Sequence, residues 1–199
     1  MSLSIINEGT DNFISYSTKD DLRLNGTITV HGNSNHLAIG PGAVAHNVRI
    51  TLGTGCKVII GSKCRLGGLF IHATEGSQVT IGHRSGFNGQ ARLMLHEAAR
   101  IEIGRGCLFA AETDVTVSDM HSIIDIASGE RVNPAQNVII GERVWVGQRA
   151  MVLKGSHIEA GSIIGAGSIV AGHVPPNSLA VGIPARVIRS GVTWNHKLL

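Results

Sequence analysis

His121 could take part in proton-transfer chemistry, although without the residues that flank it a surface histidine of a loop is the simpler interpretation. A neutral imidazole, with an ordinary pKa near 6.5, can accept a proton from a hydroxyl group at neutral pH. Asp119, two positions earlier, could orient the ring through its second nitrogen, although a backbone carbonyl could do so equally well. Because the chain has 10 histidines, the surroundings of His121 must distinguish a functional residue from an ordinary surface one.

Those surroundings are the one long break in a regular six-residue repeat. Towards the C-terminus, an aliphatic residue recurs at every sixth position, and a small or β-branched residue follows four positions after each. A helix repeats at about 3.6 residues and a flat strand at about 2, so neither element explains this period. The period predicts a triangular parallel β-helix in which each six-residue unit forms one short strand and one corner. The aliphatic series is Ile140, Val146, Val152, Ile158, Ile164 and Val170.

The same repeat, with longer turns, continues upstream as recurring Ile-Gly pairs. Between Val115 and Ile140 the aliphatic frame fails, and residues 119–136 have mixed polarity. A loop longer than about 12 to 15 residues in a regular scaffold is usually functional. We therefore expect a functional loop here. The expected division is a single domain, 1–199, with an N-terminal cap (1–25), coils (26–174) and a C-terminal extension (175–199).

Composition agrees with a solenoid and excludes several function classes. Aromatic residues make up only 4% of the 199 residues, whereas the chain has 26 glycines, as a stack of turns requires. The net charge of +3 comes from scattered cations without aromatic interleaving, which argues against nucleic-acid binding. We find no signal peptide and no apolar run near the roughly 20 residues needed to cross a bilayer, which favours a cytoplasmic protein without membrane contact.

The repeat also assigns individual side chains to the inside or outside. Cys56, Cys64 and Cys107 each lie four residues after an aliphatic position, which favours buried thiols over nucleophiles, metal ligands or a disulfide framework. Trp145 precedes the inward Val146, so its side chain should point outward. An outward tryptophan usually packs on something, either a substrate or another subunit.

Four short stretches, taken together and in this order, resemble the hexapeptide-repeat acyltransferases, in particular the sugar and polysaccharide O-acetyltransferase branch. The likeness is closest over residues 100–189. The stretches are Ser118-Asp119-Met120-His121, Val144-Trp145-Val146-Gly147, Ile164-Gly165-Ala166-Gly167-Ser168 and Val181-Gly182-Ile183-Pro184-Ala185-Arg186-Val187-Ile188-Arg189.

The resemblance implies an all-β, single-stranded, left-handed parallel β-helix that assembles as a homotrimer with active sites between subunits. It implies acetyl-CoA as the acyl donor, no metal, His121 as the general base and Trp145 in the active site. The family's fold departs from the usual right-handed crossover, so the hand comes from the resemblance and not from the period.

The resemblance also implies contacts with coenzyme A. Ala166 and Ala171 match positions where a small residue lets the pantetheine arm approach the backbone, with Gln148 on the preceding coil. Gln148 is larger than the small polar residue often found there. Arg186 and Arg189 match basic residues that face the nucleotide phosphates, although two solvated arginines would look the same in the sequence.

The acceptor is less well defined. The expected N-terminal helix of larger sugar acetyltransferases has no counterpart here, so an open cleft could admit a glycan chain. The competing functions are an N-acetyltransferase of an amino sugar or antibiotic, a zinc hydratase of the γ-carbonic-anhydrase type and a non-catalytic scaffold. The spacing of His72, His83, His96 and His121 matches no familiar zinc ligand set. Candidate acceptor contacts are Asp125, Glu130 and Arg131 in the loop, and Asn88, Gln90 and Arg92 on the preceding coil.

Overall fold

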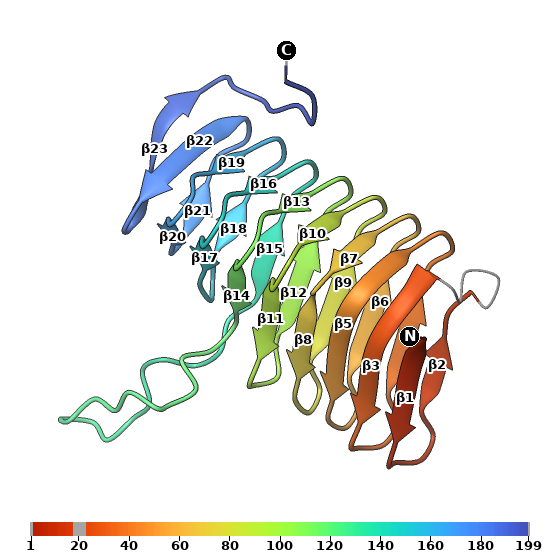
Figure 1. The fold of residues 1–199 in the computed structure, drawn as a ribbon. Coiled ribbons are helices and arrows are strands. Elements are labelled where there is room, and N and C mark those ends of the chain that lie inside the picture. Colours follow the sequence, from red (N-terminus) through yellow and green to blue (C-terminus); the bar gives the residue numbers. More distant parts are fainter. Residues whose placement is uncertain (1, 18–22, 199) are drawn as a thin grey trace.

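The chain winds into a parallel β-helix of short strands (Figure 1). This computed structural model describes residues 2–17 and 23–198. Three strands and three corners make one rung, and equivalent strands of successive rungs pair in parallel. The N-terminus and the C-terminus lie at opposite ends of the stack (Figure 1). Within the described residues, no helix is long and apolar enough to cross a membrane.

The three walls of the prism are named here I, II and III. Strand β5 (Val44–Leu52) bends around the corner between walls I and II, since its first residues pair with β7 and its last with β8. Wall I contains β7 (Arg65–Gly67), β10 (Gly86–Asn88), β13 (Leu108–Phe109), β16 (Trp145–Val146), β19 (Ile163–Ile164) and β22 (Ser178–Gly182). Wall II contains β1 (Leu3–Asn7), β3 (Leu24–Val30), β5, β8 (Phe70–Ala73), β11 (Arg92–Leu95), β14 (Asp114–Thr116), β17 (Met151–Val152) and β20 (Ile169–Val170). Wall III contains β2 (Phe13–Ser15), β4 (His36–Ile39), β6 (Lys57–Ile60), β9 (Gln78–Ile81), β12 (Arg100–Ile103), β15 (Val138–Ile140), β18 (His157–Ile158) and β21 (His173–Val174).

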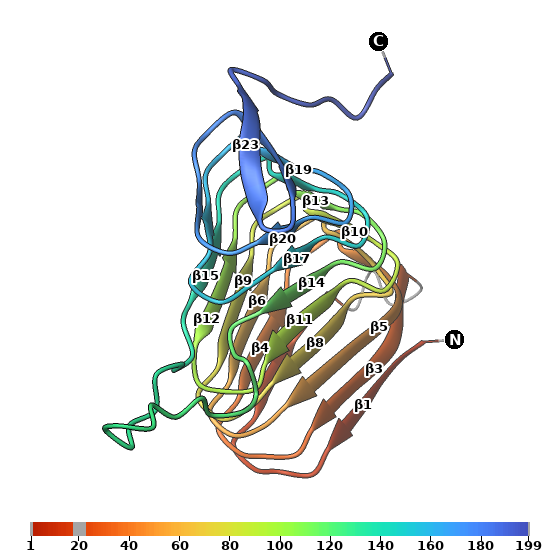
Figure 2. The ribbon, with the colours of Figure 1, turned by 90° about the vertical axis from the view of Figure 1, so that its left-hand side faces the viewer.

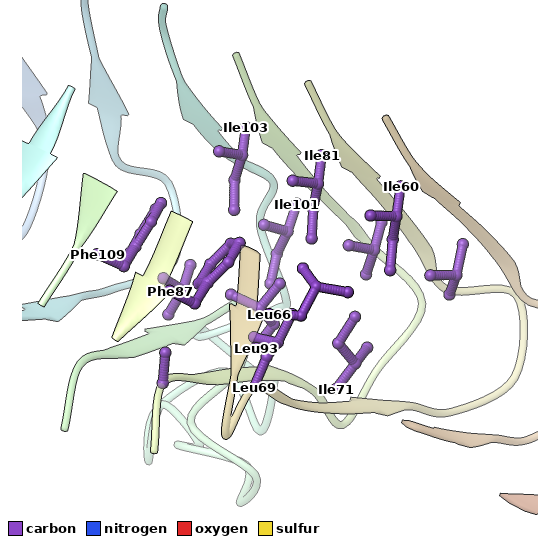
Figure 3. Packing of buried hydrophobic residues seen from close by; sticks show 14 of the residues in the cluster. Ile60, Leu66, Leu69, Ile71, Ile81, Phe87, Leu93, Ile101, Ile103 and Phe109 are labelled. Atoms are coloured by element: carbon purple, nitrogen blue, oxygen red, sulfur yellow. The ribbon is translucent and has the colours of Figure 1, made fainter. Parts of the chain in front are cut away.

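The aliphatic positions of the repeat fill the interior, as the period predicts. Along each wall, residues alternate between the core and solvent, so the two-residue strands near the C-terminus bury one side chain each and the four-residue strands upstream bury two. Equivalent residues stack from rung to rung, for example Ile60, Ile81 and Ile103 (Figure 3). Phe87 and Phe109 stack inside wall I with ring centroids 4.8 Å apart (Figure 3). The core is therefore one continuous column, and the all-β solenoid prediction is confirmed.

The glycine of each Ile-Gly pair is explained by the close approach of the next rung. A Cβ atom on Gly82 would lie 2.4 Å from the backbone nitrogen of Arg105, and one on Gly104 would lie 2.6 Å from that of Glu142. No side chain fits at these distances, so the recurring pair marks where neighbouring rungs are closest.

Both ends of the described chain stay attached to the prism. Strand β1 pairs with β3 and β2 pairs with β4, so residues near the N-terminus form one more rung rather than a separate covering segment. Residues 1 and 18–22 of the expected N-terminal cap lie outside the described residues. At the other end, β23 (Ala185–Ser190) turns back antiparallel on β22. The chain then returns to wall I, where Trp194 is 7% exposed.

All three thiols are buried and free, as predicted. Burial raises the pKa of Cys56 and Cys64, and raises the pKa of Cys107 to about 11. At neutral pH the thiols are therefore protonated and shielded, so we expect almost no reaction with an aromatic disulfide reagent until the protein is unfolded. Labelling in denaturant provides the full count of three thiols. Rapid modification of a native thiol would contradict the structural role assigned to these residues.

Candidate active site

A long loop leaves the prism between β14 and β15 and projects away from it (Figures 1 and 2). It begins after Thr116 and ends before Val138, which is the segment where the repeat fails. Its two arms are joined by an isolated antiparallel bridge between Ile124 and Arg131. The tip carries exposed apolar side chains, with Ile126 fully exposed. Such a tip is typical of a segment that packs against something outside its own chain.

His121 lies at the start of this loop, and its ring is exposed. The backbone fixes its position: its N–H donates to the Asp119 carbonyl at 2.8 Å, and its carbonyl accepts from Asn133 Nδ2 at 2.8 Å. The ring nitrogens make no hydrogen bond to any residue that the structure describes. His121 therefore has a held backbone and a free imidazole, the arrangement a general base needs before substrate binds.

The Asp119 carboxylate has described hydrogen-bond partners other than that imidazole. It accepts hydrogen bonds from Lys154 Nζ at 2.5 Å and from Asn133 Nδ2 at 2.8 Å. The bond from Lys154, followed by the bond from Asn133, lowers the pKa of Asp119. The structure thus brings Asp119 to the base of the loop, where it supports His121 through Asn133 rather than through a contact with the ring.

Asn133 is the centre of the cluster that closes the loop. It is 6% exposed, and its Oδ1 accepts from the backbone N–H of Ile123 at 2.7 Å while its Nδ2 reaches Asp119 and the His121 carbonyl. One buried amide therefore joins the two arms of the loop. We call the cluster around it the loop stem; its members are Glu97, Ser118, Asp119, Arg131, Asn133 and Lys154.

Glu97 fastens the loop stem to the rung before it. Arg131 donates to both Glu97 carboxylate oxygens, at 2.6 and 2.8 Å, and Ser118 Oγ donates to Oε1. The Arg131 bonds, and then the Ser118 bond, lower the pKa of Glu97 to about 2. Lys154 completes the cluster from the following rung through Asp119 and the Asn133 carbonyl. Three rungs thus hold one loop.

The lowered carboxylate pKa values predict that acid opens the loop before it melts the core. A depressed folded-state pKa adds stability above the ordinary pKa, and this stability is lost as the pH falls through the folded value. For Glu97 this window runs from 4.5 down to about 2. Pepsin digestion across that window should cut the loop increasingly as the pH falls. Glu97→Gln should be cut already at the upper end of the window, and equal protection of both proteins would contradict this role.

Trp145 points outward from wall I, as predicted, and is 38% exposed. Its neighbours in the wall are Leu108 and Ile163 on the adjoining rungs. The returning C-terminal segment places the Trp194 ring 6.2 Å from the Trp145 ring, centroid to centroid. Trp194 is itself held by its Nε1, which donates to the Arg143 carbonyl at 2.6 Å. Trp145 therefore remains partly accessible on the outer surface of wall I, next to the ring of Trp194.

His121 and Trp145 lie on different walls, and no hydrogen bond or ring contact joins them among the described residues. His121 follows β14 of wall II, whereas Trp145 belongs to β16 of wall I.

The proposed donor contacts divide between two corners and the C-terminal hairpin. Gln148 and Ala166 lie on successive rungs at the corner of walls I and II, where the N–H of Gly167 donates to the Gln148 carbonyl at 2.8 Å. Ala171 follows β20 and so lies at the next corner, between walls II and III. Arg186 and Arg189 are exposed on β23. The structure therefore brings Gln148 and Ala166 together but sets Ala171 apart from them.

Several candidate acceptor residues already have partners within the chain. Arg92 forms an ion pair with Asp114 at 2.5 Å, and Arg131 is committed to Glu97 in the loop stem. Asp125 accepts hydrogen bonds from the backbone and hydroxyl of Ser128, which shapes the loop tip. These side chains stabilise the protein's own turns and walls.

The histidines considered for zinc form a pair rather than a ligand set. His72 and His96 lie on neighbouring rungs with ring centroids 4.8 Å apart. Desolvation, and then the neighbouring His96, lowers the pKa of His72. Among the residues described here, no group of three or more histidine, cysteine or carboxylate side chains could hold a metal ion.

Comparison with known proteins connects this geometry to a family. Residues 137–172 match the family of bacterial transferase hexapeptide repeats (six repeats). A polysialic acid O-acetyltransferase of Escherichia coli O1:K1 / APEC is 39% identical over 124 residues, covering 62% of this chain and 40% of that protein. One from Neisseria meningitidis is 30% identical over 137 residues, covering 67% of this chain and 62% of that protein. The matches thus span less than two thirds of either relative's length.

Solved structures extend the likeness over the whole fold. The crystal structure of the polySia-specific acetyltransferase NeuO superposes with a TM-score of 0.90 at 29% identity, covering 98% of this chain and 90% of that one. The structure of the polysialic acid O-acetyltransferase OatWY superposes with a TM-score of 0.79 at 24% identity, covering 99% and 92%. The β-helix is accordingly left-handed, as expected.

Proposed function

Because the chain belongs to the hexapeptide-repeat acyltransferases, we propose that it is an O-acetyltransferase acting on a hydroxyl of a sugar or polysaccharide. The observation that carries the proposal is the match to two polysialic acid O-acetyltransferases in a chain that keeps a free histidine ring on a projecting loop. An acidic polysaccharide of the polysialic acid type is the first acceptor to consider.

In this proposal His121 is the general base. Its neutral imidazole takes the acceptor's hydroxyl proton as the hydroxyl oxygen bonds to the acetyl carbon, and it then returns the proton to the departing sulfur. Acetyl-CoA supplies the acetyl group as a thioester, so no metal is needed. Trp145 provides an apolar surface against which the acceptor or the donor arm packs. We place the reaction in the cytoplasm, where acetyl-CoA is available.

The corner of walls I and II has room for the arm of coenzyme A. A Cβ on Gly167 would meet no atom within 4 Å, so the backbone beside Ala166 is open. Gln148 can hydrogen-bond an amide of the arm from the rung before. Arg186 and Arg189 are exposed on β23 and can bind the nucleotide phosphates through charge-assisted hydrogen bonds.

We further propose a homotrimer in which His121 of one subunit works beside Trp145 of the next. The different walls of the two residues and the exposed apolar loop tip support this assembly. The test is complementation: His121→Ala and Trp145→Ala subunits, each inactive alone, are mixed by co-expression. Random mixing into shared sites should restore about a quarter of wild-type activity. No recovery in isolated mixed oligomers would place both residues in one subunit's site.

The acceptor class is tested by incubating the protein and acetyl-CoA with polysialic acid, neutral polysaccharides, amino sugars and aminoglycosides. Release of the coenzyme A thiol measures turnover, and mass spectrometry identifies the product. We expect an added acetyl group that mild alkali removes, since esters hydrolyse where amides persist. An alkali-stable product on an amino sugar would replace the proposal with N-acetylation.

A further inference from the structure

The corner between walls III and I carries a row of exposed cations on consecutive rungs. Lys63, Arg84 and Arg143 occupy the same turn position, with φ values of 59°, 61° and 53°. On the rung between the last two, Gly106 takes that position and Arg105 precedes it. Since paired strands lie about 4.8 Å apart, the row has one positive charge per step of roughly that size. We call these four residues the cationic corner.

The charges of the cationic corner are largely unneutralised. Arg105 pairs with Glu142 at 2.8 Å, whereas Lys63 and Arg84 have no ion pair with any described residue. The Arg143 guanidinium lies 5.9 Å from the Trp194 ring centroid. The surface between the cations is an open groove of about 600 Å³ that Ser62 and His83 also line.

Two other exposed arginines in the described chain form ion pairs across neighbouring rungs. Arg149, at the corner of walls I and II, bonds to Glu112 at 2.8 Å, and Arg92 on wall II bonds to Asp114 at 2.5 Å. Intramolecular pairs of this kind use the cation to link neighbouring rungs. At the cationic corner Arg105 forms such a pair, but Lys63, Arg84 and Arg143 form no ion pair with a described residue. Their positive charges face solvent along one line, and a bound anion would relieve their mutual repulsion.

The row ends at the candidate active site. Arg143 precedes Trp145 by two residues on the same rung, and the Trp194 ring contacts both, at 5.9 Å from the guanidinium and 6.2 Å from the Trp145 ring. An extended ligand bound along the cationic corner would therefore reach Trp145 where the row ends, at Arg143.

We propose that the cationic corner is a binding track for an acidic polysaccharide, holding several carboxylate-bearing residues of the chain while one residue is presented at Trp145. This inference rests on the proposed function and names the acceptor class of the same site. Each contact between a surface cation and a carboxylate is weak, but a polymer makes several at once, so the effects multiply. Guanidinium groups also suit the planar carboxylate.

The test compares a long and a short acceptor in a double variant remote from Trp145. In Lys63→Gln/Arg84→Gln, the KM for long-chain polysialic acid should rise about three- to tenfold, the range expected for two exposed ionic contacts. The KM for a sialic acid dimer should rise much less, because Arg84 and Lys63 lie two and three rungs from Arg143, at about 4.8 Å per rung, and a dimer held at Trp145 is too short to reach both. Raising the salt concentration should narrow the difference between variant and wild type.

Two further variants serve as controls. Lys63→Arg/Arg84→Lys keeps both charges and should restore the long-chain KM. Arg49→Gln/Lys57→Gln removes two positive charges from walls II and III and should leave that KM near the wild-type value. Equal effects of the two charge-removing variants would mean that only net charge matters, and would overturn the track.

The remaining outcomes are also decisive. An unchanged long-chain KM, or an equal rise for dimer and polymer, would overturn the proposal. A selective rise in the KM for acetyl-CoA would show that the cations hold the donor's phosphates instead. If the wild-type protein acetylates no acidic glycan, the proposed function fails by itself. The track is then tested by binding to immobilised polysialic acid without acetyl-CoA. Weaker binding of Lys63→Gln/Arg84→Gln than of wild type would support the track, and equal binding would overturn it.

Discussion

Replacing His121 with alanine should lower kcat for acetyl transfer by about 10²- to 10⁴-fold, the usual contribution of a positioned general base. The ring makes no hydrogen bond to the described residues, and the contacts that fix His121 come from its backbone. Alanine keeps those backbone bonds, so the loop and the prism should remain folded. Steady-state kinetics with the best acceptor from the screen measure the effect, with oligomer size and thermal unfolding as checks on structure.

A second exposed histidine provides the matched control. His46 lies at a prism corner, and no described residue hydrogen-bonds to its side chain. His46→Ala removes the same ring from the surface and should retain near-wild-type kcat. Binding of acetyl-CoA, measured by calorimetry, should persist in His121→Ala because the proposed donor contacts lie elsewhere. Full turnover in His121→Ala would remove the histidine from the mechanism.

The repeat explains why so much of the fold could be predicted. In a solenoid each rung contacts only its neighbours, so a local period carries nearly all the information on which side chains point inward. The cysteines and Trp145 took their predicted sides for this reason. Even the break in the period was informative, because a chain that leaves a regular stack must form a loop.

The loop stem could not be predicted in the same way. Its bonds join Arg131 to Glu97 across 34 residues and Lys154 to Asp119 across 35, and a period says nothing about such pairs once the chain has left the stack. Asn133 stands before a proline, which indicates only a turn. The contact between Trp194 and Trp145 likewise depends on where the C-terminal segment returns.

The position of Asp119 shows what the spacing of two residues in a sequence leaves open. Its spacing to His121 allowed either its carboxylate or a backbone carbonyl to orient the ring. Among the described residues the direct contact between the two is instead made by the backbone, where the His121 N–H bonds to the Asp119 carbonyl. The carboxylate is then free to turn toward Lys154. Support for the histidine passes through Asn133, which contacts both residues.

Replacing Asn133 with aspartate should therefore lower kcat by about 10- to 100-fold, because small displacements of a catalytic group have effects of this size. Aspartate has nearly the same shape and keeps an acceptor for the Ile123 N–H. It loses the N–H donors to Asp119 and to the His121 carbonyl, and it sets a second carboxylate beside Asp119. The loop stem should loosen while the core, which it does not enter, stays intact.

Asn137→Asp is the matched control for this change. Asn137 stands at the end of the same loop, but its side chain acts as an acceptor, from the Arg100 N–H at 2.9 Å, and aspartate keeps that role. In Asn137→Asp, we expect kcat to stay near the wild-type value and hydrogen exchange of the Ile123 amide to stay slow. In Asn133→Asp, we expect kcat to fall and that exchange to become faster, while the melting transition of the prism stays unchanged. Equal kinetics in the two variants would show that the loop positions His121 without its buried amide, and unfolding of the prism in Asn133→Asp would make the asparagine a core residue instead. A loss of kcat joined to faster exchange in the loop alone identifies Asn133 as the residue that positions the base.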